Sequence, residues 1–258
     1  MTPKYLIPTL LGLTLLLAAC SGQPGLATCE VPDPSLAAAI NAATGQPEGD
    51  PIGCLDLDGL TKLAAVRLDI RDLSGLEHAH NLTELDIGMN SITDLTPLES
   101  LESLAVLVLQ GNRISDLAPL AGLTGLTHLH LTANEVVSLA PLENLIDLER
   151  LSLAGNQVRV IDSLGSMHGL KTLDLSANMV RDIGPLSGLE ALDALYLDLN
   201  RIEDITPLLA NHGLAGAQLL SVRRNCLDLS ATSDVPAQLA QLQERVNEVR
   251  FEPQLNCA

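Results

Sequence analysis

Asparagine recurs at every twenty-second position through the middle of this chain. The six positions in phase are Asn90, Asn112, Asn134, Asn156, Asn178 and Asn200. The same apolar frame surrounds each asparagine, and in the first unit it consists of Leu82, Leu85, Ile87, Ile92, Leu95, Leu98 and Leu101. A repeat of this length indicates a solenoid, because each unit buries its apolar face against copies of itself. The repeat therefore predicts one elongated domain rather than separate globular cores.

The frame is similar to the leucine-rich-repeat pattern Leu-x-x-Leu-x-Leu-x-x-Asn-x-Leu. Within each unit, a segment such as residues 84–88 alternates apolar and polar positions, which predicts a short strand with leucine inward. Successive strands are expected to stack in parallel at about 4.8 Å. The predicted fold class is an α/β solenoid with a curved parallel sheet, short 3-10 or irregular turns on the convex side, and helical caps.

The repeated polar residues are expected to be structural. A buried asparagine amide has both a donor and an acceptor, so it can bond the backbone of neighbouring turns. The next asparagine of this kind is Asn225, which follows Asn200 after a longer interval than the others and predicts three extra residues near 212–216. Aspartates at positions 94, 116, 182 and 204 precede turns that start with proline and are expected to cap them. The fourth unit has Val160 and Ser163 in these two slots, so its outer turn should differ locally.

Both ends of the array carry predicted caps. Asp33 followed by Pro34 predicts the start of a helix that ends at Gly45 and covers the open edge of the first unit. Residues 55–76 are interpreted as an entry unit without the asparagine, with Leu63, Val66 and Leu68 as its strand frame. Residues 236–246 predict a C-terminal helix, and residues 249–251 a short extended segment.

These features together resemble the internalin type of bacterial leucine-rich repeat. The resemblance is carried by Asp94-Leu95-Thr96-Pro97-Leu98 and by the matching segments at 116–120, 182–186 and 204–208. It covers roughly residues 32–229. The resemblance implies a module that binds another protein through the concave face of the sheet.

The N-terminal segment, residues 1–20, has the layout of a secretory signal: one lysine, an apolar run over residues 5–17, and small residues. The run ends in Leu17-Ala18-Ala19-Cys20, which resembles the lipobox of bacterial lipoproteins. Cys20 is therefore expected to be the lipidated first residue of the mature chain, anchored in the outer membrane if the cell has two membranes. An ordinary signal peptide, or a short anchor with an incidental cysteine, is the alternative.

Four further cysteines flank the array. Two precede it and two follow it, which favours the pairs Cys29 with Cys54 and Cys226 with Cys257 in an oxidising compartment. A reduced thiol or a zinc site is the alternative, although neither pair has Cys-x-x-Cys spacing. The predicted organisation is a signal peptide (1–19), a tether (20–28), an N-terminal cap (29–59), the repeat array (60–225) and a C-terminal cap (226–258).

Charge and composition narrow the classes of partner. The chain has 32 acidic and 14 basic residues, a formal net charge of −18, which argues against nucleic-acid binding because phosphate backbones are repelled. It contains no tryptophan, one phenylalanine and two tyrosines, so few aromatic anchors are available to a ligand. No cofactor motif is found, and a monomer is expected.

Candidate site residues lie at the outward strand positions, which do not repeat. His128 and His130 share one strand face, Arg150 neighbours His128, and Asp174 and Tyr196 follow on later strands. We expect these five residues to contact a protein ligand. A metal site at the histidine pair is the alternative, but Asp86 and Asp174 lie about 10 Å away, beyond a common first coordination shell.

Two other functions remain open from the sequence. One is a structural scaffold of the cell envelope without a tight ligand. The other is a hydrolase with Ser152 beside His130 and Asp174, which have suitable residue types but lie on an open surface without a nucleophile motif. We therefore predict a binding module that is not an enzyme.

Overall fold

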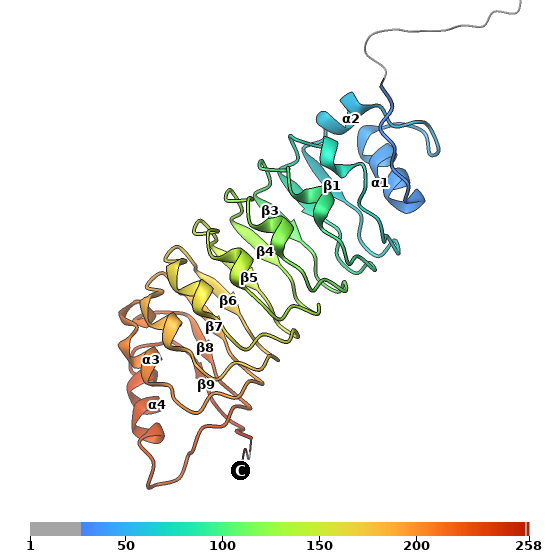
Figure 1. The fold of residues 1–258 in the computed structure, drawn as a ribbon. Coiled ribbons are helices and arrows are strands. Elements are labelled where there is room, and N and C mark those ends of the chain that lie inside the picture. Colours follow the sequence, from blue (N-terminus) through green and yellow to red (C-terminus); the bar gives the residue numbers. More distant parts are fainter. Residues whose placement is uncertain (1–26, 256, 258) are drawn as a thin grey trace, which may run out of the picture.

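The computed structural model describes residues 27–255 and residue 257 as one elongated, curved solenoid (Figure 1). The units follow one another in chain order, so the two described ends lie at opposite ends of the molecule. The predicted signal peptide, Cys20 and residues 21–26 of the predicted tether lie outside the described residues. Within the described residues, no helix has the length and apolar character needed to cross a membrane.

In this part of the chain, nine short strands form one parallel sheet whose order follows the sequence. They are β1 (Lys62–Ala64), β2 (Glu84–Asp86), β3 (Val106–Val108), β4 (His128–His130), β5 (Arg150–Ser152), β6 (Thr172–Asp174), β7 (Ala194–Tyr196), β8 (Leu219–Ser221) and β9 (Val249–Arg250). Strands β1 to β7 pair in a register of one repeat unit, so Leu63, Leu85 and Leu107 lie side by side. The predicted solenoid with a parallel sheet is confirmed.

The rest of each unit connects one strand to the next through a short helical turn. These are η1 (Leu76–His78), η2 (Thr96–Leu98), η3 (Ala118–Leu120), η4 (Ala140–Leu142), η5 (Asp162–Ser166), η6 (Gly184–Gly188), α3 (Thr206–Ala210) and η7 (His212–Leu214). The Oδ1 atom of Asp94 accepts a hydrogen bond of 2.8 Å from the N–H of Thr96, and the aspartates at 116, 182 and 204 do the same for their turns. These carboxylates satisfy backbone donors that have no partner inside the turn.

The fourth unit, which lacks both aspartate and proline, has a longer turn of five residues in η5. The next turn, η6, also has five residues although Asp182 and Pro185 are present. The predicted difference is therefore real, but it extends beyond the unit whose sequence departs from the pattern.

Aliphatic side chains fill the interior, as the composition predicts. The central leucines of β2 to β7 are at most 1% exposed, and the isoleucines, valines and leucines of the turns pack behind them. Each such side chain contributes roughly 1.5–3 kcal/mol by leaving water. Because every unit supplies the same shape, the core continues from one unit to the next without a closed centre.

The asparagines pair backbone groups that the strands leave open. In the third unit, Asn134 Oδ1 accepts from the N–H of Ile114 at 3.0 Å, and Nδ2 donates to the carbonyls of Leu109 and Leu131 at 3.0 and 3.1 Å. The same three bonds recur at Asn112, Asn156, Asn178 and Asn200. Each amide joins its own unit to the preceding one, which fixes the spacing between them.

The residue before each asparagine slot has a left-handed backbone. The eight positions are Arg67, Met89, Gly111, Ala133, Gly155, Ala177, Leu199 and Arg224, with φ between 54° and 68°. Only two are glycine, and each of the others costs about 1–2 kcal/mol because its Cβ crowds the following carbonyl oxygen. The turn that presents the asparagine therefore depends on the ladder to hold it, and it was not predicted because these positions share no residue type.

The first cap forms as the sequence predicts. Helix α1 (Pro34–Thr44) begins after Asp33, whose Oδ1 accepts from Ser35 and Leu36 N–H groups at 3.0 and 3.1 Å, and it ends at Gly45 with φ 75°. The other oxygen of Asp33 accepts from the Arg71 N–H at 2.9 Å, which joins the cap to the first unit. A disulfide links Cys29 to Cys54, the first residue of α2 (Cys54–Asp58).

The predicted strand frame of the entry unit is wrong in two of its three residues. Val66 and Leu68 are 36% and 41% exposed, whereas Leu63 and Ala65 are buried. Side chains alternate along a strand, so Ala65 takes the inward place although Val66 is more hydrophobic. Leu68 occupies the asparagine slot, and Asn90 of the next unit accepts from the N–H groups of Leu68 and Ile70 instead.

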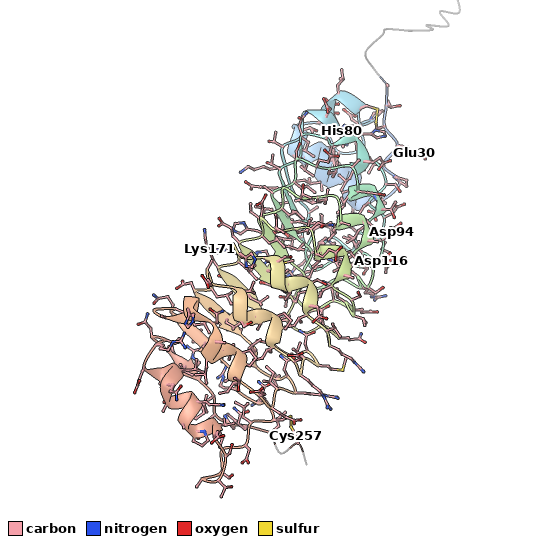
Figure 2. All side chains as sticks on the ribbon, turned by 60° about the vertical axis from the view of Figure 1, so that its left-hand side comes forward. Glu30, His80, Asp94, Asp116, Lys171 and Cys257 are labelled. Carbon is pink, nitrogen blue, oxygen red and sulfur yellow. A yellow bond between two sulfur atoms is a disulfide. The ribbon has the colours of Figure 1, made fainter. Side chains whose placement is uncertain are left out.

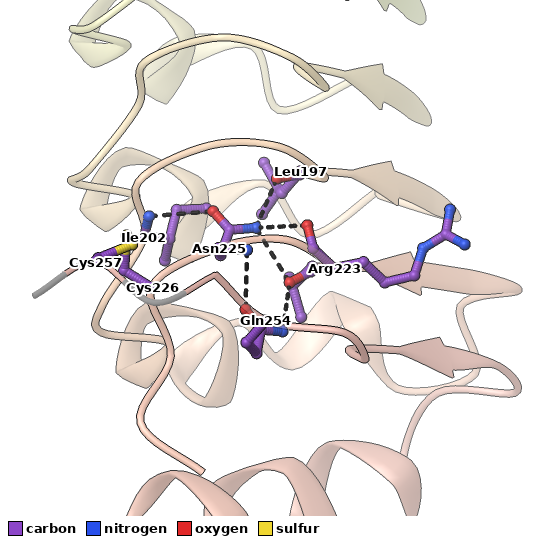
Figure 3. The surroundings of a disulfide bond; sticks show 8 residues. Leu197, Ile202, Arg223, Asn225, Cys226, Gln254 and Cys257 are labelled. Atoms are coloured by element: carbon purple, nitrogen blue, oxygen red, sulfur yellow. Dashed lines mark hydrogen bonds between the residues drawn. A yellow bond between two sulfur atoms is a disulfide. The ribbon is translucent and has the colours of Figure 1, made fainter.

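The last unit ends in a cap that repeats the asparagine bonds (Figure 3). Asn225 accepts from Ile202 and donates to Leu197, and its own N–H donates to Gln254 at 2.9 Å. The adjacent Cys226 is bonded to Cys257. Helix α4 (Val235–Gln243) lies beside α3 at this end (Figure 1), and the predicted extended segment forms β9, which pairs with β8.

Replacing Asn134 by alanine should lower the free energy of unfolding by roughly 3 kcal/mol or more, because three buried backbone groups lose their partner. Urea unfolding of the variant measures this. The control is Thr132→Ala in the same unit, a partly exposed outward residue, which should change stability by less than about 0.5 kcal/mol. Equal effects of the two substitutions would contradict the structural role of the ladder.

Removing the first disulfide with the double substitution Cys29→Ser and Cys54→Ser should cost about 3.5 kcal/mol, since the bridge closes a loop with a sequence separation of 25. The shift in the urea midpoint of the variant measures the loss. An unchanged midpoint, together with thiol labelling that finds both Cys29 and Cys54 reactive in the unaltered chain, would contradict the pairing.

Candidate functional site

The outward side chains of the strands form columns across the exposed face of the sheet, called the concave face here because solenoids of this kind curve around it. The register gives a first column of Lys62, Glu84, Val106, His128, Arg150, Thr172 and Ala194. The second column consists of Ala64, Asp86, Val108, His130, Ser152, Asp174, Tyr196 and Ser221. At about 4.8 Å between strands, nine strands span roughly 38 Å.

The register brings three of the five predicted contact residues together. His128 is paired with Arg150 on the next strand, and His130 lies beyond His128 on the same face. Asp174 is two strands from His130, and Tyr196 is one strand farther. The candidate residues therefore form one cluster of His128, His130 and Arg150, here called the histidine–arginine cluster, and two separate positions toward the C-terminal cap.

Arg150 is the permanent charge of this cluster. Within residues 27–255 and 257, its guanidinium has no carboxylate within 4.0 Å. Other cations on or beside the concave face do have partners, at N–O distances of 2.6 to 2.8 Å: Lys62 with Glu84, Lys171 with Glu149, Arg223 with Asp198, and Arg250 with Glu248. Glu149, the carboxylate nearest to Arg150 in sequence, is thus already paired with Lys171. Figure 2 shows Lys171 on the opposite side of the solenoid from Asp94 and Asp116.

Burial lowers the pKa of His130 below its usual value, and the like charges of His128 and Arg150 lower it further. Asp86, on β2, acts in the opposite direction. The imidazole of His130 is therefore mostly uncharged at neutral pH. The cluster presents one fixed positive charge and two imidazoles that can gain protons.

The metal alternative lacks a third ligand in the described part of the chain, where no group of three His, Cys, Asp or Glu side chains is placed to hold an ion. Asp86 and Asp174 are each two strands from His130. Their Oδ1 atoms accept from the N–H groups of Gly88 and Ser176 at 3.0 and 2.9 Å. These carboxylates therefore face the backbone of their own strands.

The residues of the hydrolase alternative lie on three adjacent strands, as the sequence places them. Ser152 is paired with His130 on one side and with Asp174 on the other. All three side chains are partly exposed on the open sheet, and in the described residues no hydrogen bond joins the Ser152 hydroxyl to His130. The three residues are therefore neighbours with the residue types of a Ser-His-Asp triad, but the hydrogen bond that would activate the serine is not formed.

At the C-terminal end, the predicted Tyr196 belongs to a second group of side chains whose other members were not predicted as site residues. Tyr196 faces Ser221 on β8, and Ser221 faces Arg250 on β9. Asp198, whose side chain is 13% exposed, accepts from Ser221 Oγ at 2.6 Å and from Nε and Nη2 of Arg223 at 3.0 and 2.7 Å. The three extra residues of the last unit change the interval between equivalent positions, so the 22-residue repeat does not predict which residues of β8 join the columns. The alternation of Leu220 and Val222 was the one sequence signal that could have placed Ser221 in the second column.

Comparisons with known proteins agree with the geometry. A family model described as leucine rich repeats (2 copies) matches residues 102–144 and 146–188. The repeated fold and this match define a leucine-rich-repeat protein. Internalin C2 of Listeria monocytogenes is 32% identical with a TM-score of 0.60, over 74% of this chain and 97% of that chain. The chain belongs to the internalin family of leucine-rich-repeat proteins.

Two further solved structures from the same species have the same architecture. An internalin, InlF, is 26% identical with a TM-score of 0.69, over 86% of this chain and 70% of that chain. The functional domain of InlJ is 20% identical with a TM-score of 0.63, over 90% of this chain and 63% of that chain, and supports the fold alone. No curated protein matches the chain in sequence.

Two charge-neutralising variants should move the pKa of His130 in opposite directions. Arg150→Gln removes a like charge and should raise it, whereas Asp86→Asn removes an attractive charge and should lower it. An NMR titration of the imidazole Cε1–H resonance measures both. A His130 pKa at or above the ordinary value of 6.5 in the unaltered chain would contradict the described burial of this ring.

Proposed function

We propose that the chain is an exported, lipid-anchored module that binds another protein through its concave face. The proposal rests on a difference between the inward and outward residues of each strand. Inward residues repeat and hold the fold, whereas outward residues differ from unit to unit. They place Arg150 beside two histidines, with no carboxylate of the described residues within 4.0 Å of its guanidinium. Side chains that the fold does not need are free to be used for recognition.

The dimensions and residue types of this face suit a protein ligand. A strip roughly 38 Å long can contribute to an interface of about 800 Å² per partner, the usual size for specific complexes. Tyr196 and Arg150 belong to the residue types that most often dominate binding energy. The strands are held by the asparagine bonds, so little conformational entropy is lost when a ligand binds.

A monomer is the proposed state. Helix α1 packs against β1 at one end of the sheet. At the other end β9 has only two residues, and short edge strands offer little backbone for pairing with a second copy. The open edges that would favour association between copies are therefore small.

Export and anchoring are supported by the sequence of the N-terminus and by the disulfides. The lipobox-like ending at Cys20 would place an acylated cysteine before the first cap, and each buried methylene contributes about 0.8 kcal/mol to membrane attachment. The disulfides at both ends of the solenoid suit an oxidising compartment. Outer-membrane sorting in a cell with two membranes is part of the proposal.

A photo-cross-linking residue at position 172, next to Arg150 in the first column, should trap a discrete protein when the full chain is expressed in its own cells. Arg150→Glu should reduce the yield of this adduct at least tenfold, about 1.4 kcal/mol of binding free energy. Arg159→Glu is the matched control, because it makes the same charge change at an exposed position outside the strands and should preserve the adduct. Absence of any adduct that depends on Arg150 would favour a structural scaffold without a tight ligand.

Labelling with radioactive palmitate tests the anchor separately. The unaltered chain should incorporate label and fractionate with membranes, and Cys20→Ala should abolish both properties. Label that persists in the Cys20→Ala variant would contradict lipidation at this residue.

A further inference from the structure

We propose that the histidine–arginine cluster is a seat for one carboxylate side chain of the protein ligand, and that the ligand binds more tightly as the pH falls from 8 to 6. This inference rests on the proposed binding role of the concave face. It adds the chemistry of the partner: an acidic side chain, with basic side chains two strand spacings to either side of it.

Arg150 supplies the fixed half of the seat. It lies in register with His128, and no carboxylate of the described residues lies within 4.0 Å of its guanidinium. The adjacent Glu149 is bonded to Lys171 at 2.8 Å, while its charge acts on Arg150 and His128 at longer range. A guanidinium presents paired donors whose spacing matches the two oxygens of a carboxylate. In a chain with net charge −18, an unpaired cation on the concave face marks the place where an anionic group is accepted.

Thr127 determines which nitrogen of neutral His128 carries the proton. Thr127 Oγ1 lies 3.0 Å from the carbonyl oxygen of Ala105, which also accepts from the backbone N–H groups of Thr127 and His128 at 2.9 and 3.1 Å. Because this oxygen can only accept, we assign the hydroxyl proton to it. The same Oγ1 lies 2.9 Å from Nδ1 of His128. With the hydroxyl proton directed to Ala105, Nδ1 is the donor in this contact, and this tautomer is part of the proposal.

This tautomer determines what the other ring nitrogen of His128, Nε2, can bind. Neutral His128 has its one proton on Nδ1, so Nε2 carries a lone pair that repels a carboxylate oxygen. Protonation turns Nε2 into a charged donor, and no other side chain of the described residues occupies it. The contact between His128 and a carboxylate therefore exists only in the imidazolium form.

The surroundings restrict the ligand to one central acid. On the β3 side the cluster is flanked by Val106 and Val108, which shield it from water and strengthen charge interactions. Of the carboxylates on β2, Glu84 is paired with Lys62, while Asp86 lies two strands from His130. On the other side, β5 presents Arg150 and Ser152, and β6 presents Thr172 and Asp174. Glu149 and Lys171 directly precede these two strands. Asp86 and Asp174 would repel further acids and attract bases at about 10 Å.

The sign of the pH dependence follows from these contacts. In the free protein the pKa of His130 is lowered, chiefly by burial, so the imidazole holds few protons above neutral pH. A bound carboxylate favours the charged form of the imidazoles and raises the pKa of His130, so binding takes up protons. Affinity then increases as pH falls through the pKa values of the complex, by at most about tenfold per pH unit for each proton taken up.

The test uses the full chain and a capped peptide, Lys-Ala-Glu-Ala-Lys, followed by NMR titration of the histidine resonances. Two extended residues span about 7 Å and keep lysine and glutamate on one face, so the long lysine side chains can reach toward Asp86 and Asp174 when glutamate is at the cluster. The glutamate peptide should shift His128 and His130 and bind at least fivefold more tightly at pH 6 than at pH 8. The matched peptide with glutamine in place of glutamate should show no such change.

Two variants of the protein sharpen the test. Arg150→Gln should remove the preference for glutamate over glutamine. Thr127→Val, which preserves side-chain shape but removes the acceptor for Nδ1–H, should let neutral His128 place its proton on Nε2 and so reduce the affinity ratio between pH 6 and pH 8. A ratio that is unchanged in the Thr127→Val variant would contradict the assigned tautomer and overturn the proposed switch.

The peptide affinities test the carboxylate seat, and the cross-linked adduct at position 172 tests the proposed function separately. Equal affinity for the two peptides, or affinity that does not change between pH 6 and pH 8, overturns the carboxylate seat. If the adduct at position 172 still depends on Arg150 in that case, the concave face binds a protein by other chemistry. Loss of the Arg150-dependent adduct overturns the proposed function itself.

Discussion

The fold depends on one repeated interaction, the pairing of an asparagine amide with three backbone groups of two consecutive units. Leucine burial supplies most of the stabilisation, but aliphatic side chains of similar shape would tolerate a slip between units. The amide bonds do not, because a buried N–H or carbonyl left without a partner costs about 1–3 kcal/mol. The bonds of Asn134 and its counterparts therefore set the position of each strand relative to the next.

This constraint explains how the protein can vary its surface freely. Each unit holds its left-handed turn, its asparagine and its inward leucine, and these residues are all used by the fold. The outward positions of the same strands are held just as rigidly but contribute little to stability. Histidines on β4 and an arginine on β5 can therefore be placed side by side without cost to the frame, at a spacing that the register determines. The ends are closed by the helices and disulfides rather than by further units.

Much of this structure follows from the sequence because the repeat is strict. The asparagine interval predicts the sheet, its register and the columns, and Asp33 with Pro34 predicts the first helix. Prediction fails where the repeat weakens. In the entry unit hydrophobicity favours Val66 and Leu68, but the phase of the strand buries Ala65. At the other end, β9 has no repeat to identify it, so Arg250 was not placed beside Ser221.

The chemistry of the candidate site is only partly visible in the sequence. Spacing places His128, His130 and Arg150 on one face, since that requires only the alternation of a strand. It does not reveal that Glu149 is bonded to Lys171, or that Thr127 Oγ1 contacts both the Ala105 carbonyl and Nδ1 of His128. Both facts depend on which side chains meet across neighbouring strands, and they decide whether the cluster accepts an acid.

The central claim is that the repeating residues hold the fold and the non-repeating outward residues carry recognition. The most direct measurement replaces His128, His130, Arg150, Asp174 and Tyr196 together by serine, then determines both the urea unfolding curve and the amount of protein ligand captured in cells. The account predicts a free energy of unfolding within about 1 kcal/mol of the original and complete loss of capture. A collapse of stability, or capture that persists, would contradict it.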